Sequence, residues 1–166
     1  STYLSKFDYD GNQTTIESFG ESGNGLVGLS IIKSQDNHLI ISGRKAHQPH
    51  CMKIDGNGNV VWAYSYTGLS SDGDLYNMVM DLKETPDGGY VLVGRIAQGA
   101  KLHLIKINSD GILQWEKTAN DLSIGKSIIV LNDGKFIIAG DYYSNTVTGS
   151  QILLIKSDEL GNFPSF

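Results

Sequence analysis

The chain has one cysteine and no long apolar run among its 166 residues. Because Cys51 has no second cysteine to pair with, an internal disulfide framework is excluded and the fold must be held by packing alone. No segment reaches the roughly 18 consecutive apolar residues that a membrane-spanning helix needs, and no signal peptide is recognisable at the start of the sequence. We therefore expect a chain without a membrane span.

Basic residues are also sparse, with 13 lysines and arginines against 18 aspartates and glutamates and a net charge of -5. A nucleic-acid surface requires clustered basic side chains, and only Arg44-Lys45 comes close to a cluster. Sustained helical periodicity is missing as well, which disfavours α/β folds with crossover helices. The composition, 40% hydrophobic, is that of an ordinary globular protein, and the length suits one domain or a fragment of a larger protein.

Two kinds of short passage recur along the chain at a spacing of about 50 residues. In the first kind, a lysine at the end of a strand is followed by a turn rich in Asp, Asn and Gly. In the second kind, a turn containing aspartate leads into an apolar strand that stops at a glycine. Both patterns are typical of β-hairpins, because Asp-Gly and Asn-Gly pairs adopt the positive φ of a tight turn. The first kind starts at Lys6, Lys53, Lys106 and Lys156, and the second spans 36–43, 87–94 and 133–140.

Joined together, the two hairpins make a four-stranded antiparallel meander of about 50 residues, which is the signature of a β-propeller blade. We name its strands A, B, C and D in chain order. The chain then reads C-D, A-B-C-D, A-B-C-D and A-B-C, which is about three and a half blades in a single repeat domain. A β-sandwich is the alternative, although it would not require the same turns to recur in phase. The approximate repeat units are 1–22, 23–68, 69–120 and 121–166.

Three and a half blades do not close a ring, since closed propellers have at least about four. Half blades also leave strand edges unpaired. We therefore expect the neighbouring blades to come either from a longer chain or from other copies in a homo-oligomer. Trp62 and Trp115 occupy equivalent places in two repeats and are expected to pack between neighbouring blades.

The chain resembles the Gly-Gly-Tyr β-propeller repeats of bacterial proteins in two passages, 85–94 (TPDGGYVLVG) and 104–118. The resemblance covers nearly the whole chain and is strongest in the middle repeat. It implies propeller architecture, an extracellular or cell-surface location and a binding or scaffolding role, and it transfers no catalytic residue. The first repeat departs from the pattern at Asn37-His38, where glycines are expected, and the last lacks the tryptophan expected near Phe163.

The loops opposite the uniform turns are the expected place for function. The segments that join strands B and C lengthen from 10 to 12 to 16 residues, counted from Gly43, Gly94 and Gly140 to the next repeated lysine. Variable loops on a rigid scaffold are where binding residues concentrate. We expect a protein or a glycan as the ligand. The candidate ligand-binding residues are Arg44, His47, His50, Tyr66, Asp72, Asp74, Tyr76, Arg95, Tyr142 and Tyr143.

Three local patterns suggest a cofactor, and each has a structural interpretation. Residues 47–51 hold two histidines and Cys51, but they lack a fourth ligand at zinc spacing, and a buried thiol fits the apolar counterparts of Cys51. Turns such as 55–59 resemble the start of a calcium loop without its later glycine and glutamate. Asx turns explain them, and calcium stays open as the weaker alternative. Residues 23–28 match a dinucleotide fingerprint but lead into a strand instead of a helix, so they do not indicate a nucleotide site. Taken together, the three patterns lead us to expect no cofactor, with calcium as the weak alternative.

An enzyme is not expected, because no Ser or Cys stands in a regular arrangement with His and a carboxylate. The leading hypothesis is a non-enzymatic binding or assembly module, a propeller unit that presents its variable loops to a protein or glycan. One alternative is a glycan-active hydrolase or lyase that uses the same loop face. Another is a purely structural subunit of a multimer or filament, joined through exposed strand edges.

Overall fold

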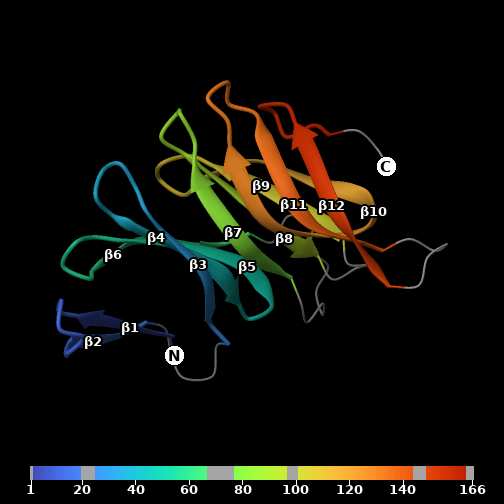
Figure 1. Ribbon diagram of the computed structural model, residues 1–166. Helices are drawn as coiled ribbons and strands as arrows, with labels where there is room; N and C mark the ends of the chain where they lie inside the picture. The colour runs from blue at the N-terminus through green and yellow to red at the C-terminus, as the bar shows by residue number, and fades with distance from the viewer. Residues whose placement is uncertain (1, 20–24, 67–76, 97–100, 144–148, 164–166) are drawn as a thin grey trace.

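The computed structural model describes residues 2–19, 25–66, 77–96, 101–143 and 149–163, which form twelve β-strands joined by turns (Figure 1). All strand pairs are antiparallel, and the described residues contain no helix. Accordingly, nothing in these ranges is a helix long and apolar enough to cross a membrane. The strands are β1 (Thr2–Phe7), β2 (Gln13–Phe19), β3 (Val27–Lys33), β4 (Leu39–Lys45), β5 (Gln48–Ile54), β6 (Val60–Ser65), β7 (Met78–Glu84), β8 (Tyr90–Ile96), β9 (Lys101–Ile107), β10 (Leu113–Val130), β11 (Phe136–Tyr143) and β12 (Ser150–Ser157).

The strands form an N-terminal hairpin, β1–β2, and two longer runs of hydrogen-bonded strands. The first sheet has the order β3-β4-β5-β6, and the second run extends from β7 to β12. This second run divides at β10, because residues 113–122 pair with β9 whereas residues 123–130 pair with β11. β10 therefore ends a four-stranded sheet, which we call the central sheet (β7–β10), and begins a three-stranded one, the last sheet (β10–β12).

This arrangement confirms the all-β class and the order of hairpins that the sequence predicts. Groups of 2, 4, 4 and 3 strands follow one another along the chain, as the order C-D, A-B-C-D, A-B-C-D, A-B-C requires. The boundary expected at residue 120 falls inside β10, which continues as a strand from one sheet into the next.

The repeated turns are held by the side chain of their first residue. In the β5–β6 turn, Asp55 Oδ1 accepts the backbone N–H groups of Asn57 and Asn59 at 2.9 and 2.8 Å. The first residue of each equivalent turn accepts two N–H groups in the same way. In the β3–β4 turn, Asn37 has a φ of 65°, the left-handed conformation that glycine adopts in the other repeats. The departure at Asn37-His38 is tolerated because asparagine takes this conformation readily.

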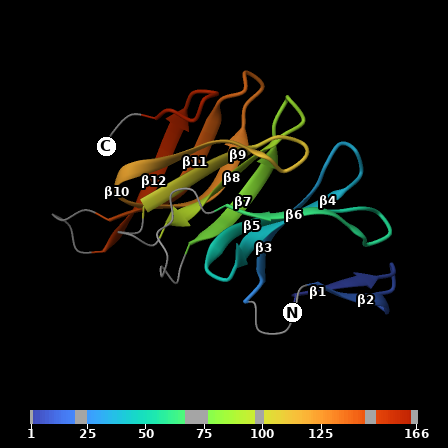
Figure 2. The ribbon, with the colours of Figure 1, turned by 180° about the vertical axis from the view of Figure 1, so that it is seen from behind.

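The central sheet is buried on both faces, between the first and last sheets (Figure 2). On one face, Leu82 and Leu92 pack with Trp62 of the first sheet. On the other, Leu104 packs with Phe136 of the last sheet. β8 and β9 are therefore nearly continuous runs of buried residues, as expected for strands covered on both sides.

Each tryptophan packs on a turn of the following sheet. Trp62 lies against Gly111, and its Nε1 donates to the carbonyl oxygen of Ser109 at 3.1 Å. Trp115 lies against Gly161 in the same way. A Cβ added at Gly111 or Gly161 would lie 2.8 or 2.5 Å from the indole, so only glycine leaves room for it. Each tryptophan therefore packs against the sheet that follows its own.

Asp81 joins three sheets at their first strands. Its carboxylate accepts the hydroxyl groups of Ser30 in β3 and Ser127 in β10 at 3.0 and 3.1 Å, and the N–H of Ile128 at 3.0 Å. Lys83 Nζ lies 2.9 Å from both carboxylate oxygens. Burial alone would raise the pKa of Asp81, but the bonds from Lys83, Ile128 and Ser30 outweigh burial and lower it. The carboxylate is therefore ionised at neutral pH.

Candidate functional site

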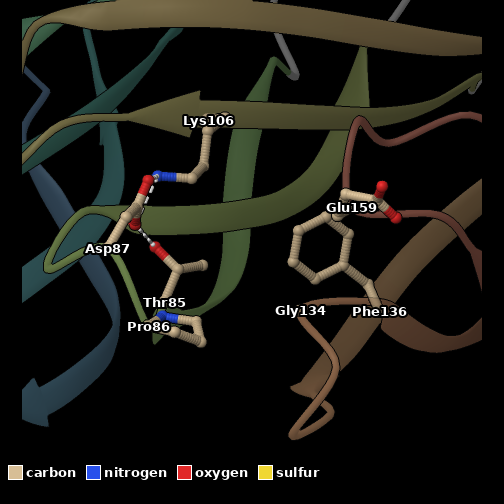
Figure 3. Close-up of a pocket in the computed structure, with 7 residues that line it drawn as sticks. All are labelled: Thr85, Pro86, Asp87, Lys106, Gly134, Phe136 and Glu159. Carbon is tan, nitrogen blue, oxygen red and sulfur yellow. Dashed lines mark hydrogen bonds and ion pairs between the residues drawn. The ribbon is translucent and has the colours of Figure 1, made fainter.

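A pocket of about 280 Å³ lies between the turns of the central and last sheets (Figure 3). The central sheet contributes the β7–β8 turn and the end of β9. The last sheet contributes the β10–β11 turn, the start of β11 and the turn after β12. The lining residues are Thr85, Pro86, Asp87, Lys106, Gly134, Phe136 and Glu159.

One wall of the pocket is polar and connected by hydrogen bonds. Lys106 Nζ lies 2.9 Å from Asp87 Oδ2 and donates to Gln114 Oε1 at 3.1 Å, while the Thr85 hydroxyl donates to Asp87 Oδ1. Gly89 leaves room for the lysine, since an added Cβ would lie 2.5 Å from Nζ. Burial would raise the pKa of Asp87, but the bonds from Thr85 and Lys106 outweigh burial and lower it to about 2. The wall thus presents an ionised carboxylate whose side chain is 55% exposed.

The interface between the first and central sheets has the same kind of polar wall, but there a tyrosine side chain lies against it. The counterparts of the lysine and aspartate are Lys53 and Asp36, whose Nζ and Oδ2 lie 2.6 Å apart. Tyr90 reaches this wall: Lys53 Nζ lies 6.0 Å from the centre of its ring, and Lys53 and Ser34 act to lower the pKa of its hydroxyl. Burial raises the pKa of Tyr90, so the phenol stays protonated. In this interface the protein itself supplies a hydroxyl group to the wall.

Phe136 is the reason why the second interface lacks that hydroxyl. It takes the place of Tyr90, since each residue begins the second strand of its sheet and pairs with the last residue of the preceding hairpin strand. The Phe136 ring closes the floor of the pocket and is almost fully buried. The other change is Glu159, which takes the place of Ser109 and adds a second carboxylate opposite the polar wall (Figure 3).

The mouth of the pocket also lacks a bridge that the first interface has. There, Glu84 Oε2 accepts the backbone N–H of Gln35 at 2.9 Å across the two sheets. The equivalent positions hold Val130, which has no acceptor in its side chain, and Pro86, which has no N–H. The second interface therefore stays open where the first is tied together.

The candidate residues that the structure describes lie at the opposite end of the sheets from this pocket. Arg44, His47 and His50 belong to the β4–β5 hairpin, and Arg95 lies near the end of β8. None of the candidate residues that the structure describes lines the pocket. Tyr142 and Tyr143 belong to β11, and Tyr66 follows β6. Asp72, Asp74 and Tyr76 lie outside the described residues.

In the His-Cys segment, His50 and Cys51 are buried, whereas His47 is exposed. The Nδ1 of His50 lies 3.0 Å from Ser65 Oγ, and burial, helped by the charge of Lys45, lowers the pKa of His50 to about 4. Burial raises the pKa of the Cys51 thiol, which makes it an unreactive core residue. Within the described ranges, no three His, Cys, Asp or Glu side chains are grouped closely enough to hold a metal ion.

The tyrosines of the candidate set have different environments. Tyr66 is buried, and its hydroxyl donates to the carbonyl oxygen of Gly111 at 3.0 Å, which ties the segment after β6 to the central sheet. Tyr143 is half-buried and donates to Asp141 Oδ2 at 3.4 Å, beside the Lys126 Nζ that lies 2.6 Å from the same oxygen. Tyr143, Asp141 and Lys126 form a small polar group at the loop end of the last sheet.

Sequence reasoning missed the pocket because it treated the repeated lysines and turns as scaffold. The available signal was a difference between repeats: Phe136 where the previous repeat has Tyr90, and Glu159 where it has Ser109. Such differences show a cavity only once the facing wall is known, and that wall comes from a different sheet.

Comparisons with known proteins give no family for this chain. No family model matches it, and no curated protein matches it. Among solved structures, it is similar to the crystal structure of a protein of unknown function from Bacteroides caccae, with 11% identity and a TM-score of 0.40. That alignment covers 96% of this chain and 72% of the other.

Proposed function

We propose that the chain is a non-enzymatic binding and assembly module, a segment of a β-propeller whose further blades come from a second copy or from a longer chain. The observation that carries the proposal is an exposed apolar face on the last sheet. Leu102 and Leu104 of β9 are fully buried between the central and last sheets. Their counterparts one repeat later, Ile152 and Leu154 of β12, are 94% and 73% exposed.

The first sheet has a similar face at the other end of the stack. Leu82 and Ile128, on equivalent strands of the central and last sheets, are buried against the preceding sheet. Their counterpart Ile31 in β3 is 54% exposed. Burial of an aliphatic side chain contributes about 1.5–3 kcal/mol, so both outer faces favour association with another sheet.

A further sheet on each outer face would continue the stacking that the chain already has. The same tryptophan-on-glycine contact and the same buried positions recur from one interface to the next. Repetition of one interface with a fixed rotation leads to a closed ring when the rotation permits closure. In such a ring the variable loops gather at one end, where we propose that a protein or glycan binds.

The mass of the chain in solution tests the assembly. We expect light scattering to show an oligomer whose population rises with protein concentration. The double variant Ile152→Lys, Leu154→Lys should be monomeric, because two charges on the outer face oppose its burial. Leu160→Lys is the matched control: Leu160 is 57% exposed but lies in the turn after β12, and the variant should assemble like the parent.

Two results would contradict the proposal. A parent chain that stays monomeric at every concentration would exclude the second copy. If a longer chain containing this segment then left Ile152 and Leu154 open to solvent labelling as well, the propeller assembly would be wrong.

A further inference from the structure

We infer that the pocket between the central and last sheets binds one sugar ring of a glycan. This inference goes beyond the proposed function, whose ligand lies at the variable loops. It adds a separate ligand site at the turn end of the sheets, away from those loops.

The first interface shows what kind of group this wall accepts. There, the lysine–aspartate–serine wall is faced by Tyr90, whose ring centre lies 6.0 Å from Lys53 Nζ and which brings a hydroxyl group to the wall. The second interface repeats the lysine and aspartate as Lys106 and Asp87, with Thr85 for the serine, but the facing Phe136 has no hydroxyl. A hydroxyl group from a ligand would restore the arrangement that the protein makes for itself one repeat earlier.

Two carboxylates provide acceptors on opposite sides of the pocket. Asp87 and Glu159 lie on opposite sides of the pocket with the Phe136 ring between them, and the Glu159 carboxylate points away from Asp87 (Figure 3). Asp87 is ionised, and its side chain is 55% exposed, so it can accept further hydrogen bonds. A ligand hydroxyl can donate to Asp87, and a sugar ring offers several such donors.

The size and walls of the pocket also suit a single ring. Its volume of about 280 Å³ is just below the range of drug-sized sites, about 300–1,000 Å³, and so leaves room for a ligand of one ring. Pro86, Phe136 and the methylene groups of Lys106 supply apolar surface for the C–H groups of a sugar.

A cationic ligand is the competing chemistry, because Glu159 gives the pocket a net negative charge. The charge of Asp87, however, is already balanced by Lys106 at 2.9 Å. The ammonium group of that lysine repels a second cation from the polar wall, whereas it leaves a neutral hydroxyl unaffected. The geometry therefore favours the sugar.

Amide chemical shifts recorded by NMR during titration provide the test. The probes are glucose, galactose and mannose, each at millimolar concentrations, with arginine amide as the cationic probe. We expect at least one sugar to shift the amides around Asp87, Lys106 and Glu159 and to leave those of the variable loops unchanged.

The key variant is Phe136→Tyr, which copies the natural first interface and supplies the missing hydroxyl. It should weaken sugar binding about tenfold or more, since the ligand then competes with a group of the protein. Phe7→Tyr adds a hydroxyl at an exposed position of the N-terminal hairpin and should leave binding unchanged. If Phe136→Tyr does not fold, Pro86→Gln with Val130→Glu restores the bridge of the first interface and should narrow the pocket instead.

Glu159→Gln separates the two ligand chemistries. It keeps a hydrogen-bond acceptor and removes the charge, so sugar binding should survive within a few-fold. Binding of arginine amide that Glu159→Gln abolishes, with no response to sugars, would overturn the inference in favour of a cation site.

Two more outcomes would also overturn it. If sugar binding persists unchanged in Phe136→Tyr, the glycan site lies elsewhere, and the binding module of the proposed function stands without this pocket. If no probe shifts any amide, the pocket is not a sugar site, and the assembly, measured separately by solution mass, is unaffected.

Discussion

The carboxylate of Asp81 shows how one side chain connects repeats that are far apart in the sequence. Its partners Ser30 and Ser127 occupy the equivalent position in the sheets on either side, so two hydroxyl donors meet one acceptor. The arrangement depends on the central repeat having Asp where its neighbours have Ser. If all three sheets had Asp at this position there would be no donor, and if all three had Ser there would be no charged acceptor.

Asp81→Asn should destabilise the chain by about 1–3 kcal/mol, because hydrogen-bond donors in three sheets lose a charged acceptor. The loss should appear in urea unfolding at pH 7. Because folding lowers the pKa of Asp81, its contribution is present above the ordinary value of 3.8 and is lost as the pH falls below it. The difference between parent and variant should therefore disappear in acid.

The matched control is Asp133→Asn. Asp133 pairs with Lys135 at 2.7 Å on the surface of the last sheet, so its loss should be too small to measure. Similar losses in the two variants would show that charge alone, and not the joining of three sheets, explains the effect.

At the scale of elements, the hairpin turns both shape the strands and receive the tryptophan of the sheet before. Gly111 needs glycine for two reasons: its φ is 79°, and the Trp62 ring occupies the place of a Cβ. Gly88, in the other turn of the same sheet, has a φ of 77° and nothing within 4 Å of an added Cβ. Substitution of Gly88 therefore tests the backbone conformation alone, whereas substitution of Gly111 tests the backbone conformation and the packing of Trp62 together.

Gly88→Ala should cost about 1–2 kcal/mol of unfolding free energy, the cost of a left-handed backbone for a residue with a Cβ. Gly111→Ala should cost about 1–3 kcal/mol more, because the indole must also move. Urea unfolding followed by circular dichroism gives both values. The fluorescence of Trp62 should change in Gly111→Ala alone, and equal losses in both variants would contradict the packing contribution.

Much of the strand order could be predicted because the turns are local. A positive φ in a two- to four-residue turn is specified by Asp, Asn and Gly themselves, so 36–43, 87–94 and 133–140 mark their hairpins without knowledge of the fold. The continuity of β10 could not be predicted in this way, because Asn120 and Asp121 are residue types that favour a turn, yet the strand runs through them. The burial of His50 and Tyr66 likewise depends on the neighbouring strand and sheet, which polar residue type alone does not indicate.

At the scale of the whole molecule, the interior of the stack differs from its ends. Leu104 and Leu154 occupy the same position in successive repeats, yet one is fully buried and the other is 73% exposed. The pocket has a similar origin, since it arises from the contrast between Tyr90 and Phe136 in two successive interfaces. The sequence shows which positions are equivalent, but only the structure shows which of them are buried, which are exposed and which leave a pocket.

Leu104→Ala should cost about 2–5 kcal/mol at any protein concentration, because it leaves a cavity inside the stack. Leu154→Ala should cost little in dilute solution and more as the concentration rises, if a second copy covers the last sheet. Urea midpoints at low and high protein concentration compare the two. A Leu154→Ala effect that does not change with concentration would indicate that no second copy covers this face.

The 18-residue β10 is bonded to β9 along its first part and to β11 along its second. Under tension, a connection of this kind behaves differently from a loop. Extended backbone has no slack, so a pull on the last sheet passes through the peptide bonds of β10 directly into the central sheet. The two sheets should therefore bear mechanical load as one piece, and separating them under force requires shearing β10 from β9 or from β11 first.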